Sequence, residues 1–372
     1  MDRKQISKRM VVKVGSQVLC DLNGELNTPV LDGLAMQISS LSEQGWQIVL
    51  VSSGAVAAGT GLLKSEPGAE KLGDIVNPVT RKQALAAAGQ VRLMETWRKQ
   101  FKIRNKTVAQ VLTSRGDFQT RQHYLNMRTC IEALLDCGVI PIVNENDVVA
   151  VTELMFTDND ELAGLLAGMI GADMLYLLST VPGVLEPASD QSSSTHIEQW
   201  NDDKHDMEEL VRTGTSSLGR GGMHSKIAIA RKTAGLGTDV VIADGSVENI
   251  LLDLCGDTAK GTHFPRNREA SPTKRWLASA QAHSSGSVCV NAGAESALLD
   301  QNRLASLLPI GITDIKGPFE RGDVIQILNE SGDVLGCGRA RYDHHEAQKR
   351  LGQHAQKPLI HYDYLYLNEL KK

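Results

Sequence analysis

Two lysines in this sequence lie where a phosphoryl group could be held, and the first interrupts an apolar run. Lys13 lies within Met10–Val14 and is followed by Gly15 and Ser16. A lysine held at the end of a strand, beside a glycine turn, can stabilise the charge of a transferring phosphoryl group. The alternative is a lysine that faces solvent from an edge strand, and the short pattern alone does not separate the two interpretations.

The second lysine, Lys226, follows the glycine-rich segment Leu218–Met223. Glycines let the backbone approach phosphate oxygens closely, and the start of a helix presents free N–H donors. A helix predicted over Met223–Ala234 puts Lys226 in its first turn. The segment is not a Walker A loop, because the G-x-x-x-x-G-K-[ST] pattern is absent. We therefore predict a phosphate site here, with a flexible loop before an ordinary helix as the alternative.

An acidic cluster, Thr157–Glu161, precedes an Ala-, Leu- and Gly-rich stretch that predicts a helix over Leu162–Ile170. Acidic residues at a helix N-terminus often serve only as caps. The three carboxylates in this segment exceed what capping needs. They could also orient lysines or hold the Mg²⁺ that accompanies ATP phosphates.

Two further polar segments follow predicted strands directly. Ser52–Ala55 comes after Gln47–Val51, and Asn144–Asp147 comes after Val139–Val143. Ligands of open α/β sheets bind at the carboxyl ends of strands, and a turn of small residues offers free N–H groups to anions. We expect all four residues of the second segment to lie beyond the strand, where amides and carboxylates could hold an amino acid. A packing turn and a capped loop are the alternatives.

The elements that position these residues alternate between strand and helix. This alternation predicts parallel strands joined by right-handed helical crossovers, with helices on both faces because the strands are continuous apolar runs. We therefore expect an α/β protein whose residues 1–266 form a three-layer α/β/α sandwich with a mainly parallel sheet. The remaining predicted strands of this part are Thr107–Leu112, Met174–Leu178 and Asp239–Ala243, and the remaining helices include Lys82–Trp97 and Arg128–Leu135.

The pattern changes after a predicted linker at Asn267–Lys274. Short strands separated by turns follow, with Glu330–Asp333 predicted as a hairpin turn. We expect a small β-rich domain at residues 275–372. Its predicted strands are Ser287–Val290, Gly311–Ile315, Val324–Leu328, Val334–Gly336 and Leu359–Leu367, interrupted by one short helix, His344–Leu351.

Composition argues against several classes of protein. The 39 Lys and Arg nearly balance the 44 Asp and Glu, giving a formal charge of −5, so nothing global indicates a nucleic-acid or anionic-membrane partner. No apolar run approaches the roughly 18 residues of a membrane span. The six cysteines are scattered without a C-x-x-C pair, which argues against metal clusters and disulfide frameworks. We expect a soluble, cytoplasmic protein.

Six blocks in this sequence resemble, in order, those of the glutamate 5-kinase family within the amino acid kinase superfamily. They are VVKVGSQVL, VLVSSGAVAAG, KQALAAAGQVRLM, IPIVNENDVV, TDNDELAGLLA and LGRGGMHSKIAIA. Four C-terminal segments resemble a PUA domain, which follows the kinase domain in many bacterial members: RWLASA, SLLPIGI, FERGDVIQI and GCGRARY. The resemblance spans almost the whole chain and implies the amino acid kinase fold followed by a PUA domain.

The resemblance implies phosphorylation by ATP of the side-chain carboxylate of L-glutamate, giving L-glutamyl 5-phosphate in the first step of proline biosynthesis. The implied catalytic residues are Lys13, Lys226 and Asp160, and the implied glutamate-binding residues are Ser53, Asp147 and Asn159. The implied ATP-binding residues are Lys13, Ser179, Thr180, Arg220, Gly221, Gly222, Met223, His224, Ser225 and Lys226. Mg²⁺ is expected to bridge the phosphates, and no metal ion held by the protein alone is expected.

The resemblance also implies feedback inhibition by proline, in competition with glutamate, and a homo-oligomer, expected to be a tetramer. One departure concerns the nucleotide. Ser179 and Thr180 stand where the family usually has Thr-Asp, which removes a carboxylate that would contact the nucleotide.

Three alternatives remain open. A sibling kinase would act on aspartate, N-acetylglutamate, carbamate or UMP, although the NEND block and the C-terminal domain argue against it. An RNA-binding protein would use the PUA domain, whose basic residues include Arg339, Arg341, Lys349 and Arg350. A degenerate kinase would act only as a regulator, although the retained catalytic lysines argue against it.

Overall fold

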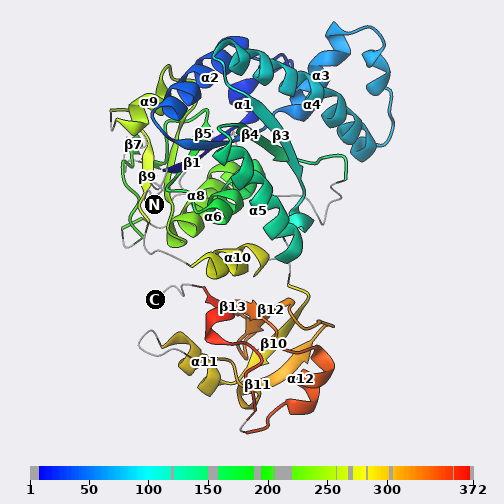
Figure 1. Cartoon of the computed structure of the whole chain (residues 1–372), viewed down its shortest axis with the longest axis vertical. Coiled ribbons are helices and arrows are strands. Elements are labelled where there is room, and N and C mark those ends of the chain that lie inside the picture. The colour runs from blue at the N-terminus through cyan, green and yellow to red at the C-terminus, as the bar shows by residue number, and fades with distance from the viewer. Residues whose placement is uncertain are drawn as a thin grey trace. The chain divides into compact units, whose positions relative to one another are not determined.

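The chain divides into two compact units. Met1–Arg115 and Met127–Glu269 form the first, whereas Gly116–Asn126 and Ala270–Lys372 form the second (Figure 1). The computed structural model describes residues 8–118, 121–149, 158–187, 194–202, 204–205, 220–256, 258–266, 271–281, 284–300, 305–354 and 356–368. No sequence signal indicates that the short segment 116–126 groups with the second unit. The domain bounds of 1–266 and 275–372 stay a prediction.

The first unit is built on a seven-stranded sheet with the strand order β3-β4-β2-β1-β5-β8-β9. Neighbouring strands are parallel, except that β9 runs antiparallel to β8. The strands are β1 (Arg9–Val14), β2 (Gln47–Ser52), β3 (Val108–Thr113), β4 (Ile140–Glu145), β5 (Met174–Ser179), β8 (Asp239–Asp244) and β9 (Thr262–Phe264). The predicted mainly parallel sheet is thereby confirmed, with a small antiparallel hairpin, β6 (Leu185–Pro187) and β7 (Ser194–His196), beside it.

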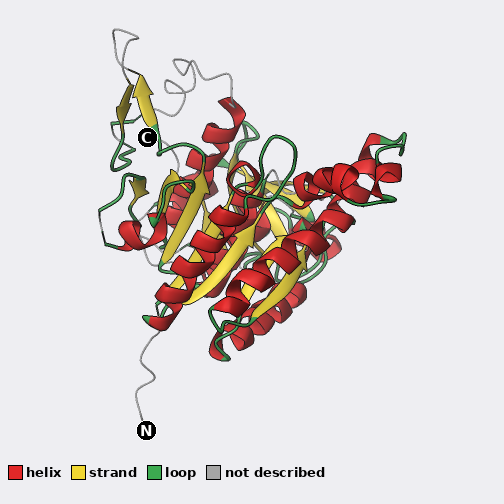
Figure 2. Cartoon of the chain, turned by 90° about the horizontal axis from the view of Figure 1, so that it is seen from above, coloured by secondary structure: helices red, strands yellow, loops and turns green. Residues whose placement is uncertain are grey.

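Helices cover both faces of this sheet, which makes the predicted three layers (Figure 2). One face carries α2 (Thr28–Glu43), α4 (Pro78–Ile103) and α9 (Ile250–Cys255), and the other carries α5 (Arg121–Asp136), α6 (Asn159–Ile170) and α8 (Arg220–Gly235) (Figure 1). Burial of large side chains holds the layers together. Trp97 and Phe101 from α4, for example, are fully buried in the same core cluster as the strand residues Val12 and Leu50.

Two helices pack unusually closely and set the position of the chain after β2. A Cβ atom on Gly89 of α4 would lie 1.9 Å from the carbonyl oxygen of Ala55, the first residue of α3 (Ala55–Ser65). A Cβ atom on Gly59 of α3 would lie 2.0 Å from the carbonyl oxygen of Leu85. Only glycine permits such an approach of two backbones. The helix α4 also extends beyond the predicted Lys82–Trp97 at both ends.

The second unit is a five-stranded sheet in the order β11-β10-β12-β13-β14, with β10 and β12 parallel and the other pairs antiparallel. The strands are β10 (Gly286–Val290), β11 (Ile312–Lys316), β12 (Val324–Leu328), β13 (Val334–Arg339) and β14 (Leu365–Leu367). The helices are α10 (Pro272–Ala280), α11 (Ala292–Leu299) and α12 (His344–Arg350). The β-rich character is confirmed.

The structure corrects three details of this second unit. The predicted linker Asn267–Lys274 overlaps α10, because Ser271 caps that helix by accepting a hydrogen bond from the Lys274 N–H. The helix α11 was not predicted. The predicted strand Leu359–Leu367 is a strand only from Leu365, because a 3₁₀ turn occupies Tyr362–Tyr364.

Among the described residues, no helix has the length and apolar character needed to cross a membrane.

Candidate active site

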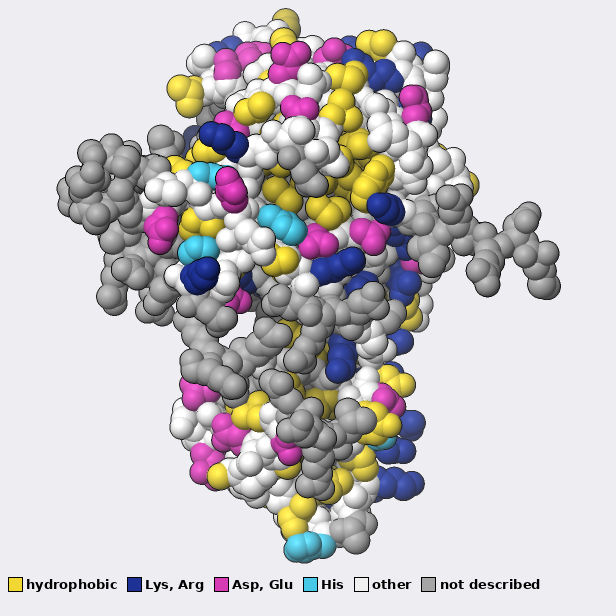
Figure 3. Space-filling view, turned by 90° about the vertical axis from the view of Figure 1, so that its left-hand side faces the viewer, with side chains coloured by type: hydrophobic (Ala, Val, Ile, Leu, Met, Phe, Trp, Pro, Cys, Tyr) yellow, Lys and Arg dark blue, Asp and Glu magenta, His cyan; other side chains and the backbone are white. Residues whose placement is uncertain are grey.

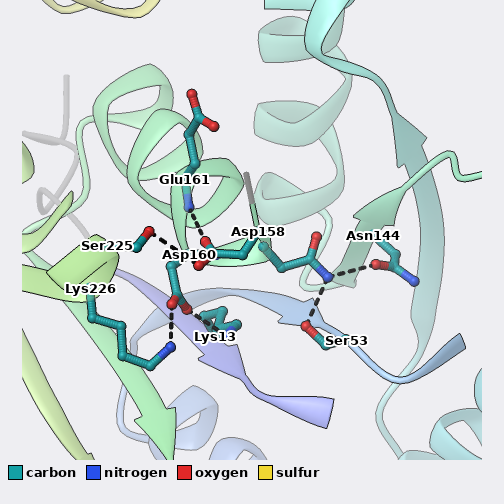
Figure 4. Close-up of polar contacts among 9 residues, drawn as sticks. Lys13, Ser53, Asn144, Asp158, Asp160, Glu161, Ser225 and Lys226 are labelled. Atoms are coloured by element: carbon teal, nitrogen blue, oxygen red, sulfur yellow. Dashed lines mark hydrogen bonds and ion pairs between the residues drawn. The ribbon is translucent and has the colours of Figure 1, made fainter. Parts of the chain in front are cut away.

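Lys13, Asp160 and Lys226 meet at the carboxyl edge of the sheet (Figure 4). Lys13 Nζ lies 2.5 Å from one carboxylate oxygen of Asp160, and Lys226 Nζ lies 2.5 Å from the other. Lys13 is 5% exposed and lies on β1, which has β2 on one side and β5 on the other. The edge-strand interpretation of Lys13 is therefore wrong. Two ammonium groups share one buried carboxylate, which leaves one positive charge formally unmatched within the triad.

The position of Asp160 follows from the start of α6. Asp158 is the N-cap of this helix, and its carboxylate accepts hydrogen bonds from the N–H groups of Asp160 and Glu161. Asp160 is therefore in the first turn of the helix, fully buried. Burial by itself raises the pKa of this carboxyl group, but the charges and hydrogen bonds of Lys13 and Lys226 outweigh burial and lower the pKa below its ordinary value. Asp160 is therefore held as the anion.

Asp158 was not singled out by sequence reasoning, although it lies beside the triad. Its second carboxylate oxygen accepts a hydrogen bond from the Ser225 hydroxyl at 3.2 Å, which ties the start of α6 to α8 (Figure 4). Burial and the charge of Asp160 raise the pKa of Asp158. The acidic cluster thus contains both a cap and a partner for the lysines, since Asp158 caps the helix and Asp160 contacts both amines, whereas the suggested role in holding Mg²⁺ stays a prediction. The adjacent Ser225 and Lys226 are the sequence signal that could have suggested the contact with Asp158.

A second polar group lies next to the triad and centres on Asn159. The side-chain amide of Asn159 donates hydrogen bonds to the Ser53 hydroxyl at 2.8 Å and to the Asn144 side-chain oxygen at 2.9 Å (Figure 4). The side-chain oxygen of Asn159 is buried and accepts no hydrogen bond from the part of the chain that the structure describes. A buried acceptor without a donor is costly, so this oxygen is suited to receive an N–H group from a ligand.

Ser53 reaches this group through a left-handed turn. Gly54, directly after Ser53, is the N-cap of α3 and has φ +106°, a conformation that favours glycine. Ser52, the last residue of β2, is fully buried and accepts a hydrogen bond from the indole of Trp97 at 2.9 Å. The small-residue segment is therefore a fixed turn at the end of β2, as predicted from its place in the sequence.

The structure corrects the expected limits of the NEND segment. Asn144 and Glu145 continue β4, paired with Leu112 and Thr113 of β3, rather than lying beyond the strand. Asn144 can remain buried because its side chain is hydrogen-bonded on both sides: it donates to Gln90 at 2.8 Å and accepts from Asn159. Sequence reasoning missed Gln90, since nothing in its helix distinguishes it from other polar residues of α4.

Asp147, in contrast, does lie beyond the strand. Together with Ala55, Gln90 and Glu145 it lines a cavity of about 280 Å³. Burial raises the pKa of Asp147, and the amine of Lys82, 3.9 Å away, opposes this effect only in part. Gln90, which lines this cavity together with Asp147, accepts a hydrogen bond from Asn144, and Asn144 accepts one from Asn159. The cavity is therefore next to the Asn159 group.

The predicted nucleotide residues come from two places at the carboxyl edge. Ser179 ends β5, and its carbonyl oxygen accepts a hydrogen bond from the N–H of Gly245 at 2.8 Å. Thr180, which is exposed, donates to the Gln17 side chain at 3.5 Å. Beside β5 is β8, which ends at Asp244.

The glycine segment differs from its prediction. The helix α8 begins at Arg220, so Gly221 and Gly222 lie in its first turn and not in a loop before it. Lys226 is consequently in the second turn rather than the first. Met223 and Ser225 are half-buried, whereas His224 is exposed. The glycines are tolerated because the first turn of a helix has few internal hydrogen bonds to lose. Side chains of residues 218–221 lie outside the described residues.

Within the described ranges, no group of three or more His, Cys, Asp or Glu side chains is arranged to hold a metal ion.

The fold and this site define an α/β protein with two lysines on one buried carboxylate at the carboxyl edge of its sheet. The Amino acid kinase family matches residues 8–244, and the PUA domain matches residues 286–362. The first match covers more than half of the chain and contains the triad. The chain therefore belongs to the amino acid kinase family, with a C-terminal PUA domain.

Curated relatives of similar length narrow this class. The chain is 44% identical to the glutamate 5-kinase of Chlorobaculum tepidum, over 97% of this chain and 98% of the relative. It is 40% identical to the glutamate 5-kinase of Bacteroides thetaiotaomicron, over 98% and 99%. It is 34% identical to that of Pasteurella multocida, over 97% and 96%. The predicted resemblance to glutamate 5-kinases is thereby confirmed.

Among solved structures, the crystal structure of UMP kinase from Ureaplasma parvum aligns with 70% of this chain and 97% of its own, at 13% identity and a TM-score of 0.46. At this TM-score the similarity is too slight to bear on the activity.

Proposed function

We propose that this chain transfers the γ-phosphoryl group of ATP to the side-chain carboxylate of L-glutamate. A glutamate oxygen attacks the γ-phosphorus, the bond between that phosphorus and the bridging oxygen of ADP breaks, and L-glutamyl 5-phosphate and ADP are formed. The full-length similarity to proteins named glutamate 5-kinase supports this substrate.

The carboxylate of Asp160 shared by two lysines is the observation that carries this function. A carboxylate nucleophile is already ionised at neutral pH, so no general base is required. What the reaction requires is alignment and neutralisation of the charge on the transferring group. Lys13 and Lys226 supply that charge, and Asp160 holds their amines apart in a fixed geometry before the substrates arrive.

We propose that glutamate lies against Ser53, Asn159 and Asp147. The acceptor oxygen of Asn159 that lacks a donor is suited to the α-ammonium group of an amino acid. The Ser53 hydroxyl, positioned by the amide of Asn159, can donate to a substrate carboxylate. Asp147 lies in a neighbouring cavity, where its charge would attract the same ammonium group.

We propose that ATP binds at the neighbouring end of the sheet. Free N–H groups in the first turn of α8 are suited to phosphate oxygens, and Lys226 extends from the same helix. Further residues proposed to contact the nucleotide are Lys13, Ser179, Thr180, Arg220, Gly221, Gly222, Met223, His224 and Ser225. Mg²⁺ is proposed as the counter-ion of the ATP phosphates. Phosphate oxygens and water can supply most of the ligands of Mg²⁺, and the ion would add to the neutralisation of charge.

Further proposals rest on the sequence: proline inhibition and oligomer formation on the resemblance, and the cytoplasmic location and the domain limits on composition and pattern. We propose that proline inhibits by occupying the glutamate position, that the chain assembles into a homo-oligomer, and that it acts in the cytoplasm. We likewise propose domain limits of residues 1–266 and 275–372.

Release of ADP tests the activity directly. Purified protein is given ATP, Mg²⁺ and L-glutamate, with hydroxylamine to trap an acyl phosphate as a hydroxamate. Parallel samples contain aspartate, N-acetylglutamate, UMP or no acceptor. We expect ADP and hydroxamate only with glutamate. Equal turnover with another acceptor would favour a sibling kinase, and no turnover with any acceptor would favour a regulator that lacks activity.

A further inference from the structure

The second unit contains a cavity whose lining is rich in arginine. Its volume is about 510 Å³, and the side chains that matter here are Arg321, Arg339, Arg341, His361, Asp363 and Tyr364. Figure 3 shows Lys and Arg side chains gathered along one edge of this unit, while Asp and Glu side chains lie mostly elsewhere on the same face. A basic cavity of this kind stands out in a chain whose formal charge is −5.

Backbone hydrogen bonds fix the segments that carry the three arginines. The N–H of Gly322 donates to the carbonyl of Ala340 at 2.9 Å, and the N–H of Ala340 donates to the carbonyl of Asp323 at 2.8 Å. The N–H of Arg341 donates to the carbonyl of Leu359 at 2.9 Å. These hydrogen bonds join the turn before β12 to the end of β13. The backbones that carry the three arginines are thus fixed next to one another, and all three arginines line the same cavity.

Among the residues that the structure describes, the arginines of this cavity have no anionic partner. Across the described residues, no carboxylate oxygen lies within 4 Å of the guanidinium nitrogens of Arg321, Arg339 or Arg341. Arg350 of the same unit, in contrast, is paired with Glu346 at 2.5 Å. Like charges that share a cavity repel one another, so a bound anion would relieve their repulsion.

Two further contacts prepare the cavity for a ligand. The guanidinium of Arg339 lies over the ring of Tyr364, 3.8 Å from its centroid, which restrains the plane of the guanidinium. The lining holds one acidic side chain, Asp363, against the three arginines, and Asp363 lies 3.3 Å from His361 Nδ1. The net charge of the lining is therefore positive.

We propose that this cavity binds a small phosphate-bearing anion, up to the size of a nucleotide. Planar guanidinium groups donate paired hydrogen bonds to phosphate oxygens, and three of them surround one space here. The volume lies within the range of small-molecule sites. The proposal is independent of the glutamate kinase activity, because all its residues belong to the second unit.

Calorimetric titration of the full-length protein tests this site, with inorganic pyrophosphate and ribose 5-phosphate as probes. We compare wild type, the triple variant R321Q/R339Q/R341Q, and Lys349→Gln. Lys349 is exposed on α12 and does not line the cavity. The triple variant keeps the proposed active site unchanged, so the binding that it loses relative to wild type reports on the cavity. A 12-nucleotide single-stranded RNA is titrated as a third probe, to test whether the cavity binds the phosphates of a nucleic acid instead of a small anion.

We expect the triple variant to lose the cavity's binding, each single Arg→Gln change to weaken it about tenfold, and Lys349→Gln to leave it unchanged. Arg339→Lys, which keeps the charge but loses the planar stack on Tyr364, should bind more weakly than wild type. Circular dichroism and thermal unfolding establish that each variant folds.

Three outcomes would overturn the site. Binding of both probes could survive in the triple variant, it could fall equally in Lys349→Gln, or only the RNA could depend on the arginines. The last outcome would assign the cavity to nucleic acid instead of a small anion.

Discussion

The amine of Lys226 lies 2.5 Å from a carboxylate oxygen of Asp160, although 66 residues separate them in the sequence. Asp160 is fully buried, so the pair is largely shielded from water. Lys13 approaches the other oxygen of the same carboxylate. Because one buried carboxylate fixes both amines, little reorganisation is needed when charge develops on a transferring phosphoryl group.

Replacement of Lys226 by alanine should lower kcat by about 10²-fold or more, because the lost charge acts mainly in the transition state. The KM for glutamate should change little. Steady-state kinetics of the two substrates checks both parameters. Lys232→Ala, an exposed position near the end of the same helix, is the matched control and should retain activity. A normal kcat for Lys226→Ala would remove Lys226 from the mechanism.

Replacement of Asp160 by asparagine should destabilise the chain by about 3–5 kcal/mol at neutral pH, because two lysines then lose their buried partner. The pKa of Asp160 is lowered in the folded state from its ordinary value of 3.8. Its ionised form therefore stabilises the fold above that value, and the stabilisation is lost as pH falls through the lowered pKa.

Urea unfolding at several pH values checks this prediction. The difference in unfolding free energy between wild type and Asp160→Asn should be largest near neutral pH and should shrink below about pH 3.8. Asp74→Asn, at an exposed position, controls for the general effect of acid. A difference that stays constant from neutral to acid pH would mean that the ionised Asp160 contributes nothing to folding.

Replacement of Asp147 by asparagine should raise the KM for glutamate about tenfold and leave kcat nearly unchanged, because the lost attraction acts on bound substrate and transition state alike. Lys82, 3.9 Å from Asp147, offers the control. If Asp147 contacts glutamate, Lys82→Ala should not reproduce the change in KM. Equal effects of the two substitutions would indicate that Asp147 acts only by its ion pair.

Replacement of Gly89 by alanine should lower the unfolding free energy by about 1–3 kcal/mol, since the new Cβ atom meets the Ala55 carbonyl and forces α3 and α4 apart. Gly33→Ala is the matched control on α2. Its Cβ atom would have nothing nearer than 4.0 Å, so helix propensity should make this change neutral or stabilising. Thermal unfolding of both variants distinguishes them, and equal stabilities would contradict the proposed close packing.

The strands were largely predictable from the sequence, and the predicted ends of several strands are wrong in the same way. Continuous apolar runs locate β1, β2, β5 and β8, but several predicted strands stop short of a polar residue that completes them. Ser52, Ser179 and Asp244 each end a strand, and Glu145 ends β4. Polarity at that point reflects the carboxyl edge of the sheet, where ligands bind, and not the end of strand pairing.

The resemblance implied both the identities of the triad residues and the task of Asp160 in orienting the two lysines, whereas the residues around each lysine did not establish them. The motif around Lys13 also fitted a solvent-facing lysine, and the motif around Lys226 also fitted a flexible loop before an ordinary helix. Only the fold shows that both amines contact one carboxylate. The hydrogen bond from Asn144 to Gln90 was missed for a related reason. Gln90 and Asn144 satisfy one another across 54 residues of sequence, and a polar side chain in a helix carries no local sign of such a partner.

The central claim is that the side-chain carboxylate of glutamate is the nucleophile. Glutamate labelled with ¹⁸O in that carboxylate is incubated with the protein, ATP, Mg²⁺ and hydroxylamine. Hydroxylamine attacks the acyl carbon and releases phosphate with the oxygen that formed the new bond. Mass spectrometry of the released phosphate should find one ¹⁸O atom, and none when only the α-carboxylate is labelled. Phosphate without ¹⁸O from the side-chain label, or labelled phosphate from the α-carboxylate, would contradict the proposed reaction.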